Sequence, residues 1–539
     1  MTQSHLNFVR HLVKKFLDFI KEAPKKNERR LLAIQDEISS ILMLDLESVR
    51  EDLEKVYAGR RGGKRPRDPV VMLRTIILMF FCSETSPYKW VSRLHQQPEL
   101  AMLSGFERGD IPGHATIYDF FRRIFWGNLK NKKNLSFKDV TYSFRHFQRN
   151  LKEEKAKVAQ QKKSERLKWN ETETALAIRN IEKIEEQRLP SDFLNRLERL
   201  LFKIAIVPSA KFGLLGDLDK LIISGDGTNL ETQANFRGKP TCKCHEVGIK
   251  KCDCDRLYSD PQATWGWNSH QERYFFGYHA HAIVANSDNH DLPLHVFVDN
   301  ANAKDPVMGV KAIHRLKKLF EEFLPSAQIY AGAFDKGYDV KDFYSFSLKH
   351  GINPIIPIRK STPTLKNNIH YDSTGWPLCP GGARYISLGI QKGKLVFHCP
   401  AKRTTHRNKK PVRLVRMEYC PLDALCDPNS KMGPFLRIPI GEDPRMTPPI
   451  LRDSKEFRRI YDKRSGVERF FSFLKETGKL KYRPYRRKYL FQFATFGLSV
   501  VAHIKAWRKH FFGTKKARSF SELIGWIESF WDKRIRLNV

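Results

Sequence analysis

The order of apolar segments between residues 219 and 358 constrains the fold more than any other feature of this sequence. Two strand-like runs, 273–285 and 292–298, are joined by the turn-rich segment SDNHD, which is typical of an antiparallel hairpin. A short apolar run at 220–224 precedes this pair, and helix-like and strand-like segments alternate after it. This order predicts an α/β fold with a mixed sheet.

The charge balance restricts the partners of the chain. Lys and Arg number 96 against 59 Asp and Glu, which gives a formal net charge of +37. Such an excess favours nucleic acid as the partner, because each neutralised phosphate releases counterions. A ribosome-associated protein or one that binds anionic membranes would show the same excess. The longest apolar stretches, such as Ile76–Cys82, are far shorter than the roughly 20 residues of a membrane-spanning helix.

Two aspartates, Asp226 and Asp335, each follow an apolar run that is predicted to be a strand. Catalytic groups gather at the carboxyl ends of strands in open α/β sheets, so two such aspartates on adjacent strands would hold a divalent metal between them. A single strand-end aspartate is more often only a turn former. Asp299 also ends a predicted strand, and Asp339 follows Asp335 by one helical turn, so both are rivals.

A predicted helix near residue 468 carries an unusual set of polar side chains. Its Tyr461, Arg464, Glu468 and Lys475 are separated by two, three and six residues. On a continuous helix these positions lie within about 40° of Glu468, so they share one face. A surface i,i+4 ion pair between Arg464 and Glu468 is the alternative interpretation.

Three carboxylates suit metal-dependent phosphodiester chemistry. Cleavage by two metals needs acids that hold the ions roughly 3.5–4 Å apart, one ion activating the nucleophile and the other stabilising the leaving oxygen. Mg²⁺ prefers oxygen ligands and keeps several waters, so Asp226, Asp335 and Glu468 would suffice. The two cations and the phenol near Glu468 would bind the flanking phosphates.

Several segments carry a resemblance to a known family. The run 461–475, YDKRSGVERFFSFLK, is similar to the Y-(2)-R-(3)-E-(6)-K signature of a large family of bacterial insertion-sequence DDE transposases. The segments IISGDGT and GAFDKGYD resemble those that bear the family's first and second aspartates. The N-terminal helical domain of related transposases resembles GRRGGKRPRDPVVMLRTIILMFF and IPGHATIYDFFRR. Together the resemblance covers roughly residues 60–145 and 219–510.

The resemblance implies an RNase H-like catalytic core preceded by a helical domain, with Mg²⁺ or Mn²⁺ as the cofactor. Family members cut double-stranded DNA at transposon ends and join the 3′-hydroxyl to target DNA, usually as dimers, in the bacterial cytoplasm at the nucleoid. The implied roles are metal binding by Asp226, Asp335 and Glu468 and contact with the DNA backbone by Tyr461, Arg464 and Lys475. Insertions between the second and third acids assist a hairpin intermediate in some members, so the cleavage pathway stays open.

Composition and periodicity divide the chain into five segments. Residues 361–450 are rich in Pro, Gly, Lys and Arg and weakly patterned, which indicates an insertion. We predict a helical N-terminal DNA-binding domain (1–145), a charged helical linker (146–215), the first part of the catalytic core (216–360), the insertion (361–450), and the second part with C-terminal helices (451–539). The linker is either a solvated helix or an arm that follows DNA.

Arg122 and Arg123 lie beside aromatic residues in a helix that begins near Thr116. A short helix of this kind would sit on DNA, although compact helical domains that bury one face look the same. We name both arginines as candidate DNA contacts.

The cysteines form one close set. The pattern C-x-C-x₇-C-x-C comprises Cys242, Cys244, Cys252 and Cys254. Four thiols this close in a reducing compartment fit a tetrahedral zinc site, and the alternative is a flexible loop with inert thiols. A second set, inside the insertion, is widely spaced, which favours four unrelated cysteines over a zinc site that would stabilise this weakly apolar segment: Cys379, Cys399, Cys420 and Cys426. The histidines His279 and His281 lie on one face of a predicted strand, where structural or DNA-facing roles are more common than metal binding. For Trp265 and Trp267 packing is favoured over stacking on a base.

Three other functions compete with a transposase. A DNA-binding protein derived from such an enzyme would keep the charge and lose activity. A metal-dependent nuclease would cut without joining. A basic RNA-binding protein would show no dependence on divalent metal.

Overall fold

The computed structural model describes residues 2–57, 66–107, 109–126, 172–187, 194–249, 252, 256–260, 262–269, 271–359, 370–372, 375–400, 402–407, 410–416, 435–439 and 443–536. Within them the N-terminal region is helical, as its periodicity predicts. Its helices are α1 (Gln3–Glu22), α2 (Pro24–Ala33), α3 (Gln35–Met43), α4 (Arg50–Glu54), α5 (Pro69–Phe81), α6 (Pro87–Gln96), α7 (Pro98–Ser104) and α8 (His114–Trp126).

Helix α5 is the centre of the N-terminal region, because nearly all of its apolar side chains are buried. Its start is fixed by sequence: Asp68 is the N-cap, its carboxylate accepts hydrogen bonds from the N–H groups of Val70 and Val71, and Pro69 occupies the first helical position. The buried indole of Trp90 in α6 donates a 2.9 Å hydrogen bond to Thr75 Oγ1, which ties the two helices together.

The middle of the chain forms a six-stranded mixed sheet. Its strands are β1 (Leu221–Glu231), β4 (Thr264–Asn268), β5 (Arg273–Asn286), β6 (Asp291–Asn300), β7 (Ile329–Phe334) and β8 (Asn353–Ile355). Strand β1 is central, antiparallel to β5 and parallel to β7, while β4 and β6 both pair with β5 and β8 extends the sheet beyond β7. The predicted hairpin, β5–β6, and the alternation with helices α13 (Asp305–Phe323) and α14 (Lys341–Lys349) are confirmed.

Strand β1 is longer than the sequence predicts. The apolar run ends at Ser224, yet the strand continues through the polar segment that follows it to Glu231, so Asp226 lies inside the strand and does not come after it. The cause is pairing with the long strand β5, which continues from Asp226 opposite Ala282 to Glu231 opposite Gly277. Local propensity favours a turn at GDGTN, and the ladder to β5 overrides it.

The C-terminal segment differs from prediction near Glu468. One continuous helix was expected there, whereas the structure has α16 (Lys455–Asp462), a break at Lys463 and Arg464, α17 (Ser465–Ser472) and a π-helical turn at Phe473–Thr477. Two longer helices follow, α18 (Lys488–Phe512) and α19 (Phe520–Arg536). Helices α13 and α17 both pack on β1, β5 and β6.

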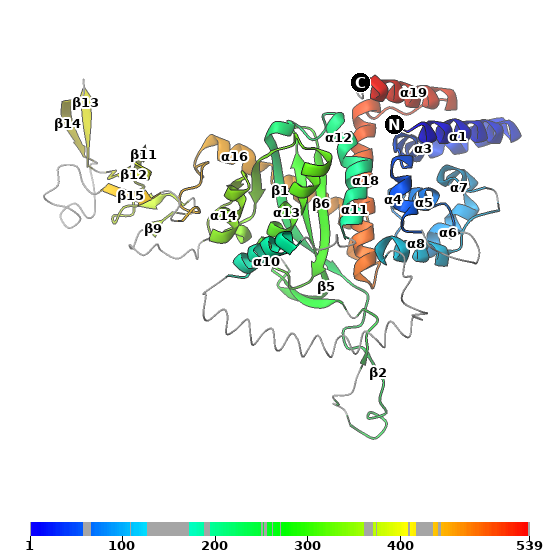
Figure 1. The fold of residues 1–539 in the computed structure, drawn as a ribbon, viewed down its shortest axis with the longest axis horizontal. Coiled ribbons are helices and arrows are strands. Elements are labelled where there is room, and N and C mark those ends of the chain that lie inside the picture. The colour runs from blue at the N-terminus through cyan, green and yellow to red at the C-terminus, as the bar shows by residue number, and fades with distance from the viewer. Residues whose placement is uncertain are drawn as a thin grey trace.

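Helix α18 joins the sheet to the N-terminal helices (Figure 1). The amide of Gln492 on α18 accepts a 2.7 Å hydrogen bond from the N–H of Val298 and donates one of 3.1 Å to the carbonyl of Val296. These bonds satisfy backbone groups at the edge of β6 that no strand pairs there. Buried side chains of the N-terminal helices, the sheet, α18 and α19 accordingly form one contiguous apolar core.

The remaining elements lie around this core. The region expected to be charged and helical contains α10 (Glu173–Gln187), α11 (Leu194–Leu201), a π-helical turn at Phe202–Ile206 and α12 (Val207–Lys211), and residues 127–171 lie outside the described residues. The segment between β1 and β4, residues 232–263, forms an arm that projects from the sheet. Within it, strands β2 (Lys239–Pro240) and β3 (Arg256–Leu257) pair.

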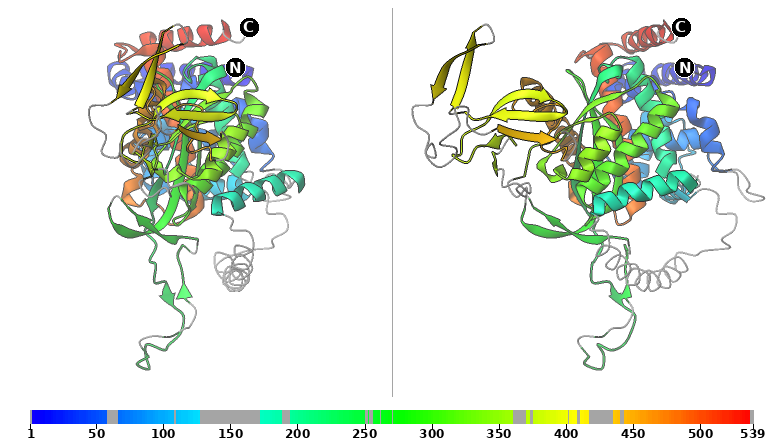
Figure 2. Two further views of the ribbon diagram at one scale, coloured as in Figure 1. Left: turned by 90° about the vertical axis from the view of Figure 1, so that its left-hand side faces the viewer. Right: turned by 60° about the vertical axis from the view of Figure 1, so that its left-hand side comes forward.

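The segment predicted as an insertion contains short strands that stand apart from the central sheet (Figure 2). They are β9 (His370–Tyr371), β10 (Pro377–Leu378), β11 (Ile386–Gln391), β12 (Lys394–His398), β13 (Lys402–Arg407), β14 (Lys410–Arg416) and β15 (Phe435–Pro439). The weak hydrophobic pattern of this segment did not predict a small apolar cluster that its side chains form: Cys379, Tyr385, Leu395, Phe397 and Ile438. The domain boundaries stay predictions.

Candidate active site

Two aspartates lie where the parallel pairing between β1 and β7 ends. The last paired residues of these strands are Gly225 and Phe334, and the next residue of each chain segment is an aspartate, Asp226 or Asp335. Backbone N–H groups orient both side chains: that of Gly227 donates to Asp226 Oδ1 at 2.8 Å, and that of Gly337 donates to Asp335 Oδ1 at 2.7 Å. The sheet therefore holds the two carboxylates at the same level of neighbouring strands.

The surroundings of the pair disfavour negative charge. Burial, aided by the charges of Asp335 and Asp305, raises the pKa of Asp226 to about 7, while the hydrogen bond from Gly227 opposes the shift. Burial and the charge of Asp305 likewise raise the pKa of Asp335. Acids that repel each other in a desolvated site are stabilised by a cation placed among them.

Arg464 connects the pair to Glu468. Its Nη1 lies 3.4 Å from Asp226 Oδ2, and its Nη2 lies 2.6 Å from Glu468 Oε1. The guanidinium also lies over the ring of Tyr461, 5.8 Å from the ring centroid. The surface ion pair considered from sequence exists, but Arg464 is also in contact with a strand residue that is 238 positions earlier in the chain.

Lys475 lies farther along the same strand. Its Nζ donates a 3.0 Å hydrogen bond to Asn229 Oδ1, three residues beyond Asp226 on β1. Burial lowers the pKa of this lysine. The prediction that one continuous helix face aligns these side chains is wrong, because they lie on two helices, the break between them and a π-helical turn. Strand β1 provides the alignment, with Arg464 at Asp226 and Lys475 at Asn229.

One further acid near this group was not predicted from the sequence. Asp305 is the first residue of α13, and its Oδ1 accepts a 2.8 Å hydrogen bond from His279 Nε2. Burial opposes ionisation, yet the hydrogen bond and charge of His279 hold the pKa of Asp305 below its usual value. The available signal was an Asp-Pro pair at a helix start, which is ordinarily only a helix-initiation pattern.

The two rival aspartates have other partners. Asp299 forms ion pairs with Lys311 and Lys488 at 3.3 and 3.2 Å, which hold its pKa low despite burial. Asp339 is buried and accepts the backbone N–H of Arg359 at 3.0 Å. Both acids thus have structural partners in the described chain.

The other predicted residues lie elsewhere. On α8, Arg122 is exposed and pairs with Asp119 at 3.1 Å, and the Arg123 guanidinium lies 5.0 Å from the Tyr57 ring centroid. His281 is buried and shares a 2.7 Å hydrogen bond with the Tyr338 hydroxyl, a structural role as expected. The tryptophans Trp265 and Trp267 remain about half exposed, at 47% and 53%.

Two family models match the chain. A family model described as Transposase DDE domain matches residues 218–499, which is more than half of the chain. The chain belongs to the DDE transposases. A second model, Transposase domain (DUF772), matches residues 22–123 of the helical N-terminal region. No curated protein sequence matches the chain.

The family match identifies the fold of the central sheet. The mixed sheet of this transposase is an RNase H-like core, and β1, which carries Asp226, is its central strand. Transposases of this family act on DNA, which fits the excess of basic residues. Among the helices that the structure describes, none has the length and apolar character needed to cross a membrane.

Proposed function

We propose that this transposase binds double-stranded transposon ends, cleaves their phosphodiester bonds and joins the 3′-hydroxyl ends to target DNA. The observation that carries the proposal is the link that Arg464 makes between Asp226, which neighbours Asp335 at the end of the β1–β7 pairing, and the distant Glu468. The family match supports the reaction class, and the residue roles are our assignment.

The donor set fits Mg²⁺ or Mn²⁺. Asp226, Asp335 and Glu468 offer only oxygen ligands, which hard divalent cations prefer. Desolvation raises the pKa of each of these partly buried aspartates, so a cation bound between them would stabilise their ionised forms. When bound, two such ions would activate the attacking hydroxyl and stabilise the leaving oxygen.

The protein's own residues orient these groups. The N–H groups of Gly227 and Gly337 hold Asp226 and Asp335 in fixed directions, so little reorganisation precedes reaction. Arg464 forms ion pairs with both Asp226 and Glu468. Once these acids bind cations, its guanidinium becomes available for a backbone phosphate, which it binds through two parallel N–H groups.

Tyr461 and Lys475 extend the phosphate-binding surface on either side of Arg464. Arg122 on α8 is a further candidate contact in the helical region, because it is exposed. A dimer assembled on paired ends is part of the proposal.

Replacing Lys475 with methionine is expected to weaken binding to end DNA and to reduce the slope of log affinity against log salt by about one. The reason is the loss of one phosphate contact, since methionine keeps the stem and removes the charge. Fluorescence anisotropy over a salt series measures both quantities. Lys481→Met is the matched control, because Lys481 is paired with Glu476 on the surface; equal effects of the two changes would contradict a specific role for Lys475.

A paired-end strand-transfer assay tests the function itself. Wild type and Glu468→Gln are incubated with the element's own end DNA, a target plasmid and Mg²⁺ or Mn²⁺. We expect wild type alone to cut and join, because glutamine keeps the shape of Glu468 and removes its charge.

Each other outcome leads to a different conclusion about the function or about Glu468. Cutting without joining would favour a nuclease. Binding of the ends by both proteins with no cutting would favour a DNA-binding protein that has lost catalysis. Equal cutting by both proteins would show that Glu468 is not a metal ligand.

A further inference from the structure

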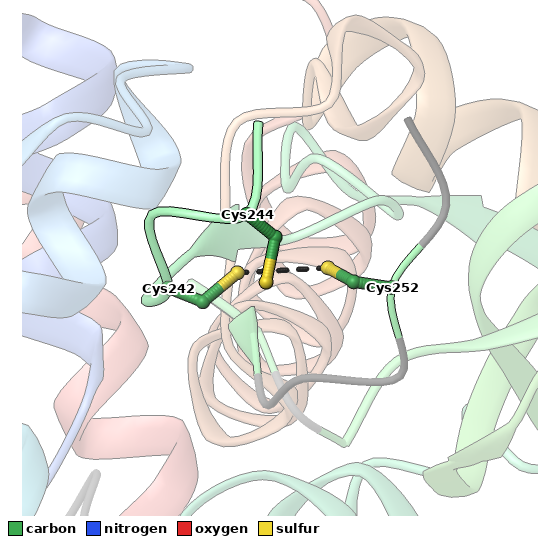
Figure 3. A group of neighbouring side chains, drawn as sticks. All are labelled: Cys242, Cys244 and Cys252. Carbon is green, nitrogen blue, oxygen red and sulfur yellow. Dashed lines mark hydrogen bonds between the residues drawn. The ribbon is translucent and has the colours of Figure 1, made fainter. Parts of the chain in front are cut away.

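A cluster of thiols lies in the arm between β1 and β4, outside the acid site. The side chains of Cys242, Cys244 and Cys252 point toward one another (Figure 3), and their Sγ atoms all lie within 4.8 Å of one another. The sulfurs of Cys242 and Cys252 are 3.5 Å apart. A disulfide requires about 2.05 Å, whereas two thiolates on one tetrahedral zinc ion, each with a bond of about 2.3 Å, are separated by roughly 3.8 Å.

In the described residues 241–249, the arm has no apolar core that would explain its shape. From residue 241 to residue 249 every side chain is exposed except those of Cys242 and Cys244, and the apolar Val247 and Ile249 are 72% and 48% exposed. The chain nevertheless turns tightly around Cys244, whose carbonyl accepts the N–H of Ile249 at 3.0 Å. When thiols are the only partly buried side chains of a segment, a crosslink between those thiols is needed to hold the segment in one conformation.

We propose that Cys242, Cys244 and Cys252 bind a structural Zn²⁺ ion that fixes this arm. Thiolates select zinc over Mg²⁺, so this ion is distinct from the catalytic metals. The fourth cysteine of the motif, Cys254, lies outside the described residues, so mutation of Cys254 and of the adjacent exposed His245 tests which residue completes the site. The strands β2 and β3 close the base of the arm, and Figure 1 shows it extending away from the sheet.

Metal analysis of the purified full-length protein tests the proposal. We expect about one zinc per chain in wild type and loss of most of it in Cys242→Ser and Cys252→Ser. Cys82→Ser and Cys379→Ser are matched controls that should keep the zinc, because Cys82 contacts the N-terminal core and Cys379 belongs to the cluster in the 361–450 segment. Comparison of Cys254→Ser with His245→Ala identifies the fourth ligand.

Limited trypsin digestion gives a readout that does not depend on transposition. Cleavage after Lys243, which is exposed, is expected to accelerate severalfold when a zinc-selective chelator is added and to be fast in Cys242→Ser without chelator. Wild-type protein without zinc after purification and zinc reconstitution would overturn the proposal. So would zinc that survives both Cys242→Ser and Cys252→Ser but is lost in Cys379→Ser.

Discussion

Replacing Asp226 with asparagine is expected to abolish DNA cleavage and, at the same time, to stabilise the metal-free protein above pH 7. Cleavage should fall by roughly a thousandfold or more, because losing about 4 kcal/mol of metal-mediated transition-state stabilisation has that effect on the rate. The stability effect has the opposite sign, because the fold disfavours the charged carboxylate. The two results together would distinguish a catalytic acid from a structural one.

The pH dependence follows from the raised pKa of Asp226. Its value moves from 3.8 to about 7 on folding, mainly through burial. The penalty is absent below pH 3.8, grows as pH rises toward 7 and is complete above it, where it amounts to at most about 4 kcal/mol. Asp226→Asn should therefore raise the thermal unfolding midpoint in EDTA at pH 8 and change it little at pH 4. Added Mn²⁺ should stabilise wild type and not the variant.

Asp299→Asn is the matched control, because this acid also lies near a strand end of the same sheet. Burial raises its pKa, but Lys488 and Lys311 together hold it below the usual value. The charge of Asp299 thus contributes stability that is present above its unfolded pKa and is lost as pH falls. Asp299→Asn should destabilise the protein at pH 8 and leave cleavage within a few-fold of wild type. Cleavage by Asp226→Asn at the wild-type rate would refute the site assignment.

Gly227→Ala is expected to lower cleavage by about a hundredfold, the effect of displacing reacting groups by about 1 Å. A Cβ at this position would lie 2.0 Å from His279 Nε2 and 2.1 Å from Asp305 Oδ1. The methyl group must separate this hydrogen-bonded pair or push β1 away from it, and Asp226 is the preceding residue. Steady-state cleavage rates with end DNA, together with circular dichroism to show that the fold persists, measure the effect.

Gly525→Ala controls for the substitution itself. A Cβ at Gly525 meets no atom within 4 Å, and the residue lies on the exposed side of α19. Alanine there should leave cleavage unchanged and slightly stabilise the helix. If Gly227→Ala cleaves as fast as Gly525→Ala, the Asp305–His279 pair does not position the site.

The alternation of strands and helices was readable from the sequence because buried strands and amphipathic helices carry their own periodicity. The hairpin β5–β6, the helices α13 and α14, and the helical N-terminal region follow from those patterns. The strands within 361–450 escaped detection because they are short and bury only a small cluster. The end of β1 was not predicted because its polar residues have no local preference for a strand. Pairing with β5 extends the strand there.

The sequence by itself determined which residue types this transposase has for its chemistry and how they are spaced, including Asp226, Asp335 and the run from Tyr461 to Lys475. Only the tertiary structure decided which of them meet. Arg464 joins Asp226 to Glu468, and His279 and Asp305 enter the same site, because β1 pairs with β5 and β7 while α13 and α17 pack on it. Such contacts depend on strand register and helix packing between residues far apart in the chain. Local sequence patterns do not specify which of these distant residues come into contact.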